Sequence, residues 1–213
     1  MNLLAIDTAA SLCAACVFDT EAGRELGREV LDLGKGHAEH LMEVIGAALE
    51  QAGSAYGDLD AIAVSTGPGS FTGVRVGVSA ARGLALALKV PAVGVTTLEA
   101  LAREARDSRP GRPVVARIEA GRGQVYLAAF STEGASTFGP AALEAQAAED
   151  FIGKAGEDAV LACGKTADIS TYARIAAERL AGGEPTERPK PLYLREADAR
   201  PQDGFALPRR GEA

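Results

Sequence analysis

The sequence is poor in the residues that most often mark redox, metal or large aromatic sites. It contains no tryptophan, two histidines and three cysteines among 213 residues, and its aromatic fraction is 5%. Three cysteines cannot form a disulfide framework, which favours a reducing compartment and a cytoplasmic protein. Because aromatic rings are scarce and 43 residues are alanine, we expect a core of closely packed small side chains.

Long apolar runs are also missing. The densest one, from Val74 to Val90, is interrupted by Arg75 and Arg82, and no basic segment precedes the apolar start of the sequence. We therefore expect neither a membrane span nor a secretion signal. The net charge of -7 argues against this chain alone as the main holder of a nucleic acid, whose phosphates require a Lys/Arg surface. Any such role would be shared.

The two histidines do not predict a metal site. His37 and His40 are three residues apart on a predicted helix, whereas the HExxH motif needs a spacing of four, and the sequence has no third histidine. The glycines before them favour a place at the helix start. A GxSxG nucleophile elbow is absent as well, so we predict no covalent catalysis and no catalytic residue.

The cysteines have no predicted chemistry either. Cys13 and Cys16 show the CxxC spacing of redox and zinc motifs, but they lie in an apolar run typical of a strand. Residues three apart on a strand point to opposite faces, so these two thiols cannot share a metal ion. We expect both of them, together with Cys163, to lie in the core.

Hydrophobic periodicity predicts two α/β units, each a mixed sheet flanked by helices. In the first unit we expect strands at 3–7, 12–18, 24–31, 61–65 and 91–95, and helices at 37–52, 72–89 and 97–106. In the second we expect strands at 114–118, 124–130, 135–138 and 159–163, and helices at 143–154 and 168–180. The polar segment 107–113 separates them, which predicts lobes at 1–107 and 108–213. The tail from Gly182 is predicted to be irregular, with about ten disordered residues at its end.

Two neighbouring turns are candidates for a nucleotide site. Gly67 and Gly69 stand in a loop that opens a helix, where free backbone amides can receive an anion. No lysine follows this loop and the GxGxxG pattern is incomplete, so it is either a tight structural turn or an unusual ligand contact. Asp7, Thr8 and Ser11 follow the first strand, where actin-like ATPases hold hydrated magnesium and phosphates; the alternative is an Asp/Thr turn.

A stripe of small residues on the long second helix suggests a close helix contact. Two glycines inside a helix cost roughly 1 kcal/mol each relative to alanine, so a tight contact should offset them. That contact is either internal packing or a partner subunit, and we expect the partner. The predicted interface consists of His37, Leu41, Val44, Ile45 and Ala48 on the first helix, and Gly73, Gly77, Ala81, Leu84 and Ala85 on the second. In the free protein this patch would pair two copies as a homodimer.

Several segments together carry a family resemblance. They read MNLLAIDTA, GHAEHLMEVI, the run from Asp60 to Leu101, GQVYLAAF and PLYLRE. The sequence resembles the TsaB family, the dimerisation subunits of the bacterial machinery that installs threonylcarbamoyl on the adenosine beside the tRNA anticodon. This resemblance implies a two-lobed actin-like ATPase (ribonuclease H-like) fold, a cytoplasmic location, a TsaD-like catalytic partner and a TsaE-like ATPase. It also implies that tRNA is reached through the complex.

Two departures limit what the resemblance implies. The catalytic sister subunit holds a metal with HxxxH, which this sequence lacks, so no metal site is carried over. The segment from Glu119 to Arg122 also differs from the family's usual Asp-Ala-Arg. We therefore expect a non-catalytic subunit without a cofactor of its own, and ATP with magnesium only in the assembled complex. The alternatives are a self-sufficient actin-like ATPase or phosphotransferase that uses Asp7 and Thr8, and a metallopeptidase.

Overall fold

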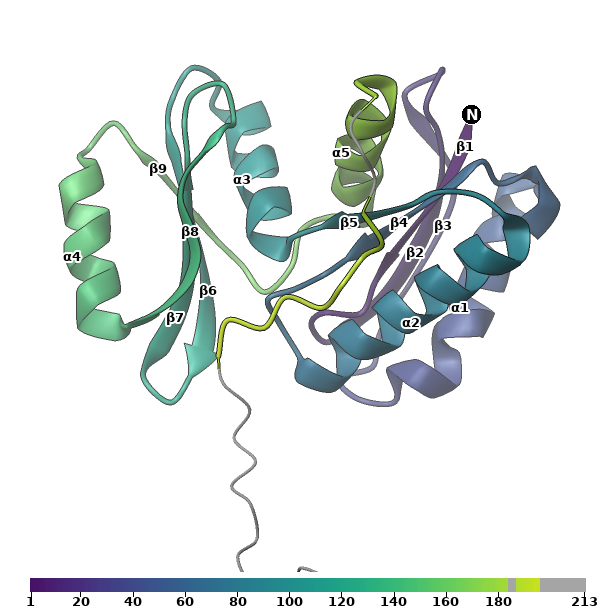
Figure 1. Ribbon diagram of the computed structural model, residues 1–213, viewed down its shortest axis with the longest axis horizontal. Coiled ribbons are helices and arrows are strands. Elements are labelled where there is room, and N and C mark those ends of the chain that lie inside the picture. The colour runs from purple at the N-terminus through teal and green to yellow at the C-terminus, as the bar shows by residue number, and fades with distance from the viewer. Residues whose placement is uncertain (184–186, 196–213) are drawn as a thin grey trace, which may run out of the picture.

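The computed structural model describes residues 1–183 and 187–195 and shows two sheets with helices outside and between them (Figure 1). Along the long axis of the molecule the layers are two helices, the first sheet, two central helices, the second sheet and one outer helix. The expected disorder at the end of the chain lies outside the described residues.

The first sheet combines a hairpin meander with two crossover strands. Its strands are β1 (Asn2–Asp7), β2 (Leu12–Asp19), β3 (Arg24–Asp32), β4 (Ala61–Ser65) and β5 (Ala92–Val95), in the order β3-β2-β1-β4-β5. β1, β2 and β3 pair antiparallel, while β4 pairs parallel with β1 and with β5. Helices α1 (His37–Ala52) and α2 (Phe71–Leu88) cover its outer face, and a short 3-10 turn spans Tyr56–Asp58.

The second sheet is smaller and has the order β8-β7-β6-β9. Its strands are β6 (Val114–Gly121), β7 (Gln124–Phe130), β8 (Ser136–Glu144) and β9 (Val160–Cys163). Helix α4 (Ala145–Ala155) lies on the outside of this sheet, while α3 (Thr97–Ser108) and α5 (Ile169–Ala181) lie between the two sheets (Figure 1).

The two central helices are exchanged between the predicted lobes. α3 ends at Ser108, at the predicted boundary of the lobes, and packs on β6, β7 and β9, whereas α5 lies well beyond that boundary and packs on the first sheet. Their apolar sides meet in one continuous core, in which Leu98 and Leu101 of α3 and Tyr172 of α5 join Leu3 and Val114. The predicted division at 107/108 therefore falls in the last turn of α3, and each central helix packs on the sheet of the other predicted lobe.

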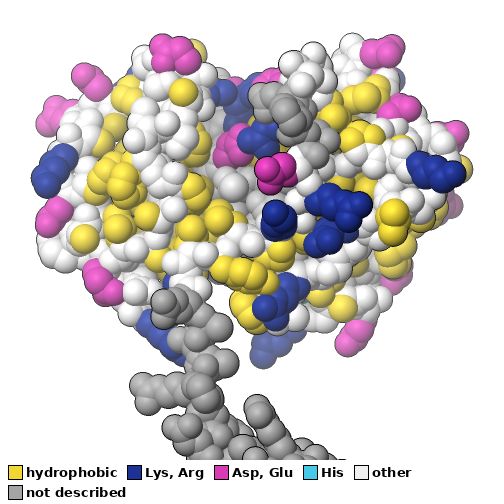
Figure 2. All heavy atoms as spheres, in the orientation of Figure 1, with side chains coloured by type: hydrophobic (Ala, Val, Ile, Leu, Met, Phe, Trp, Pro, Cys, Tyr) yellow, Lys and Arg dark blue, Asp and Glu magenta, His cyan; other side chains and the backbone are white. Residues whose placement is uncertain are grey.

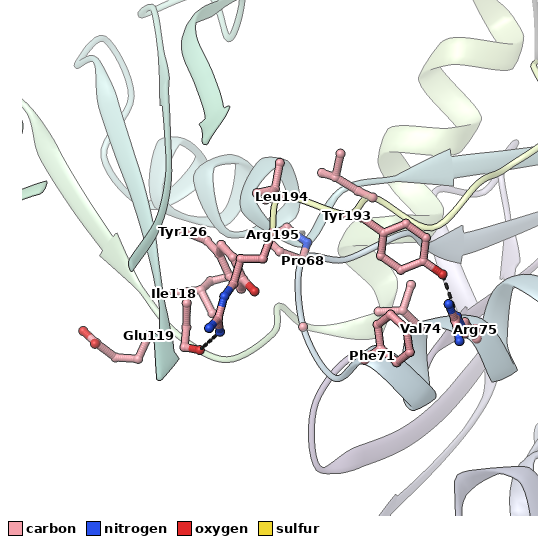
Figure 3. A pocket seen from close by; sticks show the side chains of 13 residues that line it. Pro68, Phe71, Val74, Arg75, Ile118, Glu119, Tyr126, Tyr193, Leu194 and Arg195 are labelled. Atoms are coloured by element: carbon pink, nitrogen blue, oxygen red, sulfur yellow. Dashed lines mark hydrogen bonds between the residues drawn. The ribbon is translucent and has the colours of Figure 1, made fainter. Parts of the chain in front are cut away.

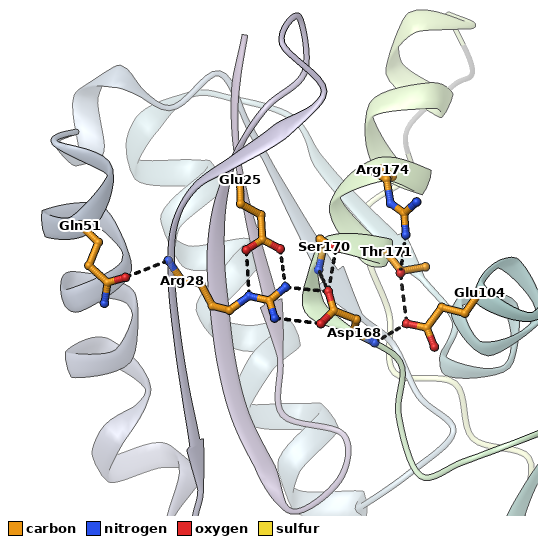
Figure 4. A network of polar contacts seen from close by, with 8 residues as sticks. All are labelled: Glu25, Arg28, Gln51, Glu104, Asp168, Ser170, Thr171 and Arg174. Atoms are coloured by element: carbon orange, nitrogen blue, oxygen red, sulfur yellow. Dashed lines mark hydrogen bonds and ion pairs between the residues drawn. The ribbon is translucent and has the colours of Figure 1, made fainter. Parts of the chain in front are cut away.

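An ion-pair network ties α5 to the first sheet (Figure 4). Arg28 on β3 pairs with Glu25 and, at 2.7 Å, with Asp168. Asp168 caps α5 by accepting from the Ser170 amide at 2.9 Å, and its own amide donates to Glu104 of α3 at 2.5 Å. One residue thus links β3, α3 and α5.

Most predicted boundaries lie within two residues of the observed ones, and those of α1, β4 and β7 coincide. The largest difference is β8, which continues to Glu144 instead of ending at 138. Pro140 hides this continuation in the sequence because it cannot donate a ladder hydrogen bond. β8 is an edge strand, where such a residue is tolerated.

The cysteines follow the alternation of their strands. Cys13 and Cys16 are buried in two different cores on opposite faces of the first sheet, which confirms the prediction for this pair. The prediction for Cys163 is wrong, because this residue is exposed. On β9, Val160 and Ala162 point inward, so the alternation places Cys163 outside.

The stripe on α2 is internal packing against the end of β1. A Cβ atom at Gly73 would lie 2.0 Å from the carbonyl oxygen of Thr8, and one at Gly77 would lie 2.5 Å from Thr8 Oγ1. The apolar side of α1 likewise faces the sheet. The predicted interface is therefore wrong in its placement, since the fold buries His37, Leu41, Val44, Ile45, Ala48, Gly73, Gly77, Ala81 and Ala85 and leaves only Leu84 partly exposed.

α2 is also the one helix, among the residues that the structure describes, with the length and mean hydropathy of a membrane span. It contributes Val74, Val78, Ala81 and Ala85 to the core above the first sheet. Its apolar character is therefore used, at least in part, inside the fold.

We predict that Gly73→Ala destabilises the chain by about 1 to 3 kcal/mol, because the new methyl group would collide with the backbone of Thr8. Gly83→Ala on the same helix is the matched control, since a Cβ there meets no atom within 4 Å. We expect this control to stabilise the chain by about 0.5 to 1 kcal/mol. Urea unfolding of both variants measures the difference, and equal effects would contradict the internal contact.

Candidate functional site

The predicted nucleotide site lies at the carboxyl end of β1, and its carboxylate is buried. Asp7 is 1% exposed, and both of its carboxylate oxygens have partners inside the protein. One accepts from the Ala9 amide at 2.9 Å, and the other accepts a short hydrogen bond from Thr166, whose hydroxyl lies 2.8 Å from that of Tyr172. The carboxylate therefore belongs to a buried polar network.

Burial changes the acidity of this network. Desolvation raises the pKa of Asp7, against the hydrogen bonds from Thr166 and Ala9, which lower it. Burial, followed by the nearby carboxylate of Asp7, also raises the pKa of the Tyr172 hydroxyl. A carboxyl group with a raised pKa and no exposed surface is poorly suited to hold a hydrated magnesium ion.

The glycine loop packs against Ala9, in the turn that follows Asp7. The Ser70 amide donates to the carbonyl of Ala9 at 2.6 Å, and a Cβ at Gly69 would lie 2.1 Å from the same oxygen. At the start of α2, the Gly73 amide donates to Ser70 Oγ at 3.2 Å, and Thr8 Oγ1 donates to the Gly73 carbonyl at 2.7 Å. Contacts within the chain thus join the turn after β1 to the start of α2.

The remaining predicted residues lie around this closed turn. Ser11 presents its carbonyl to the amides of Leu33 and Gly34, and the Gly67 carbonyl accepts from the Thr97 amide at 2.8 Å. The structure thus brings Asp7, Thr8, Gly69 and the rest of the loop together as a structural joint.

The histidines are separated by burial. His37 is 7% exposed and its Nε2 has no partner among the described residues, whereas His40 lies at the surface, 3.5 Å from Glu43. Within the described ranges, no three His, Cys, Asp or Glu side chains converge as metal ligands would.

An open cavity lies on the other side of the glycine loop, between the two sheets (Figure 3). It measures about 680 Å³ and is bordered by aromatic rings and arginines that the sequence reasoning did not select. The side chains that define it are Phe71 and Arg75 of α2, Ile118, Glu119 and Tyr126 of the second sheet, and Tyr193 and Arg195 near the end of the described chain. The PLYLRE segment was the sequence signal for Tyr193 and Arg195.

Residues 187–195 form a strap that crosses from one sheet to the other. The Leu192 amide donates to the carbonyl of Thr66 at 2.8 Å, and Arg195 donates to the carbonyl of Ala120 at 3.0 Å. Arg75 donates to the Tyr193 hydroxyl at 2.6 Å. The segment from Glu119 to Arg122, which differs from the family's usual sequence, lies in the β6–β7 hairpin. The Ala120 carbonyl in this segment accepts from Arg195 and so anchors the strap on the second sheet.

The architecture defines a two-lobed α/β protein, and comparison with known proteins gives its class. A sequence model of the TsaD family, described as tRNA N6-adenosine threonylcarbamoyltransferase, matches residues 32–191. The chain therefore belongs to this family, and the predicted actin-like fold is confirmed.

Individual relatives narrow the resemblance. The Escherichia coli tRNA threonylcarbamoyladenosine biosynthesis protein TsaB is 35% identical over 62% of this chain, a match that spans 56% of that relative. An uncharacterized protein of Mycobacterium bovis is 34% identical over 94% of both chains. A Pseudomonas aeruginosa crystal structure, described as similar to the peptidase YEAZ, has a TM-score of 0.74 at 28% identity and covers 91% of this chain and 99% of its own. The resemblance to TsaB is thus confirmed.

We predict that Asp7→Asn makes stability less sensitive to pH. Because the folded chain holds the Asp7 proton above its ordinary pKa of 3.8, wild-type stability relative to the variant is greatest below that value. It falls as pH rises through the folded pKa, by about 1.4 kcal/mol for each unit of upward shift. Urea unfolding of both proteins from about pH 4 to about pH 8 measures this, and a constant difference would contradict it.

We also predict that the isolated chain does not hydrolyse ATP with magnesium at a measurable rate, because the Asp7 site is closed by Ser70 and Gly69. A phosphate-release assay with a known sugar kinase as positive control makes the measurement. Turnover that disappears in Asp7→Ala would overturn the expectation and favour the phosphotransferase.

Proposed function

We propose that this chain is a non-catalytic subunit of the cytoplasmic machinery that forms N6-threonylcarbamoyladenosine in tRNA. It binds a TsaD-like catalytic subunit and stabilises that subunit's active conformation. Support comes from membership of the family, from the similarity to proteins named TsaB, and from the closed state of the Asp7 site. The alternative, a self-sufficient phosphotransferase, would need an accessible carboxylate at Asp7, and this side chain is buried.

The observation that carries the partner-binding role is a pair of glycines with no internal explanation. Gly46 of α1 and Gly83 of α2 stand inside helices, where each costs about 1 kcal/mol relative to alanine. Unlike Gly73 and Gly77, they face open space, since a Cβ at either position meets nothing within 4 Å. A partner helix that approaches their backbones would offset this cost.

The residues around these glycines form a face suited to a helix. Val76, Ala80, Gly83 and Ala87 recur at intervals of four, three and four, so they share one side of α2. On α1, Met42 lies one turn before Gly46 and is 50% exposed. We call these six residues the outer face. Its small side chains permit close helix packing, which replaces the buried stripe as the proposed interface.

The outer face suits related partners. The first lobe of a TsaD-like subunit resembles that of this chain, so one face can pair with a second copy or with the catalytic subunit. Homodimer and heterodimer would then compete, because both use the same residues. A TsaE-like ATPase and tRNA would join the assembled complex, and ATP with magnesium would bind there.

We predict that Gly83→Leu weakens binding to the TsaD-like subunit of the same organism while the chain stays folded. Overpacking a close contact costs about 1 to 3 kcal/mol, which corresponds to about 5- to 150-fold in affinity. Gly153→Leu is the matched control, because Gly153 is also an open glycine inside a helix but lies on α4. Isothermal titration measures affinity and urea unfolding measures stability. An unchanged affinity in Gly83→Leu would remove the outer face from the interface.

Reconstitution tests the function as a whole. Purified TsaD-like and TsaE-like subunits, unmodified tRNA, ATP and threonylcarbamoyl-adenylate are combined with and without this chain, and the modified nucleoside is quantified by mass spectrometry. We expect product only when the chain is present, and Gly83→Leu should recover activity at higher concentration by mass action. Equal product without the chain would refute the proposal.

A further inference from the structure

One face of this acidic protein is basic. It consists of Arg75 and Arg82 on α2, Lys89 at the C-cap of that helix, and Arg188 and Lys190 on the strap, and we call these five residues the basic face. All five are exposed. Figure 2 shows Lys and Arg side chains gathered over α2 and the strap, while Asp and Glu lie mainly around the rim of the molecule.

The cations of the basic face are aligned by the helix and the strap. Arg75 and Arg82 are seven residues apart, which places them on the same side of α2, and Lys89 follows seven residues later at the C-cap of the helix. Arg82, Lys89 and Arg188 border one hollow of about 490 Å³, so the strap lies directly beside that side of the helix. The charges therefore form a continuous band.

Within residues 1–183 and 187–195, no carboxylate neutralises these cations. Arg28, Arg103 and Arg117 elsewhere on the molecule each pair with two carboxylates. In the part of the chain that the structure describes, no residue of the basic face forms an ion pair with a carboxylate. The sequence has no Asp or Glu from position 61 to position 98, and Glu187 is the nearest acid along the strap.

Exposed aromatic rings stand at one end of this band, beside the interlobe cavity. Phe71 and Tyr193 are each 51% exposed, and their ring centroids lie 5.5 Å apart. The Arg75 guanidinium sits 3.7 Å from the centroid of the Phe71 ring and donates to the Tyr193 hydroxyl. Such a stacked cluster offers planar surfaces on which an unpaired base can lie.

We propose that the basic face binds RNA directly, with backbone phosphates along α2 and the strap and an unpaired base stacked on Phe71 and Tyr193. The inference rests on the proposed function, in which tRNA is the substrate of the complex. A phosphate backbone can follow a narrow band of cations, whereas a bilayer presents a plane to the whole molecule, whose net charge of -7 opposes an anionic surface. RNA is therefore favoured over a membrane.

The test measures binding of a fluorescein-labelled, unmodified tRNA transcript to the full chain by anisotropy, over a range of salt concentrations. The triple variant Arg82→Ala/Lys89→Ala/Lys190→Ala removes three cations of the basic face. We expect at least about 10-fold weaker binding at low salt, and a slope of log affinity against log salt that is shallower by about 2 to 3. The matched control Arg24→Ala/Arg109→Ala/Lys154→Ala removes three exposed cations elsewhere and should change affinity less than about 2-fold.

A second variant tests the stacking. Tyr193→Ala should weaken binding by about 5- to 150-fold to an RNA with unpaired bases. It should leave both the affinity for a fully paired duplex and the salt slope unchanged. Equal losses on both probes would refute the stacking. Urea unfolding of each variant identifies any general loss of the fold. The triple variant changes exposed side chains only, so we expect it to stay folded and to test RNA binding even if Tyr193→Ala is destabilised.

The outcomes distinguish this inference from the proposed function. Equal tRNA affinity in the triple variant and its control would overturn the inference, as would binding to phosphatidylserine vesicles through the same residues without binding to tRNA. Affinity for the TsaD-like subunit is measured on the same proteins. A chain that binds this subunit but not tRNA refutes the inference alone, whereas a chain that does not bind the subunit refutes the proposed function.

Discussion

The close approach of α2 to the end of β1 determines much of the molecule. Thr8 lies so near the helix that Gly73 and Gly77 have no room for a side chain. The same approach draws the glycine loop onto Ala9 and shuts Asp7 away from solvent. One contact thus explains both why the helix is rich in glycine and why the position typical of an ATPase site is a structural joint.

The inner side of α2 packs against the end of β1, so two other sides of the helix remain accessible to other molecules. The outer face carries small residues around Gly83, and the basic face carries cations beside the strap. The two surfaces lie on different sides of the helix and adjoin at Arg82 and Gly83, which border one hollow. This arrangement makes α2 the element through which the chain would connect a catalytic subunit to its substrate.

The exchange of α3 and α5 gives the two lobes a shared core. α3, which stands between β5 and β6 in the sequence, packs on the second sheet, and α5, which follows β9, packs on the first. Asp168 joins both helices to β3 through Arg28 and Glu104. The strap adds a second crossing through Thr66 and Ala120. The strap, which borders the cavity between the sheets, is therefore hydrogen-bonded to both lobes.

Local signals in the sequence determined the helices and strands. α1, β4 and β7 begin and end where predicted, because their apolar periods and flanking turn residues depend only on nearby positions. The opposite orientation of Cys13 and Cys16 followed for the same reason.

Only the tertiary structure decided what those elements face. A stripe of small residues serves equally well inside or outside a protein, so the sequence located the close contact of α2 but not its partner, which is Thr8 of the same chain. Gly46 and Gly83 are the same residue type as the buried Gly73 and Gly77, and they differ only in that no neighbouring atom lies within 4 Å of a Cβ built on them. The basic face depends on the strap, whose cations lie about 100 residues from Arg82 and Lys89 and meet them only through folding. Side-chain type is local information, whereas burial and proximity arise from packing between distant segments.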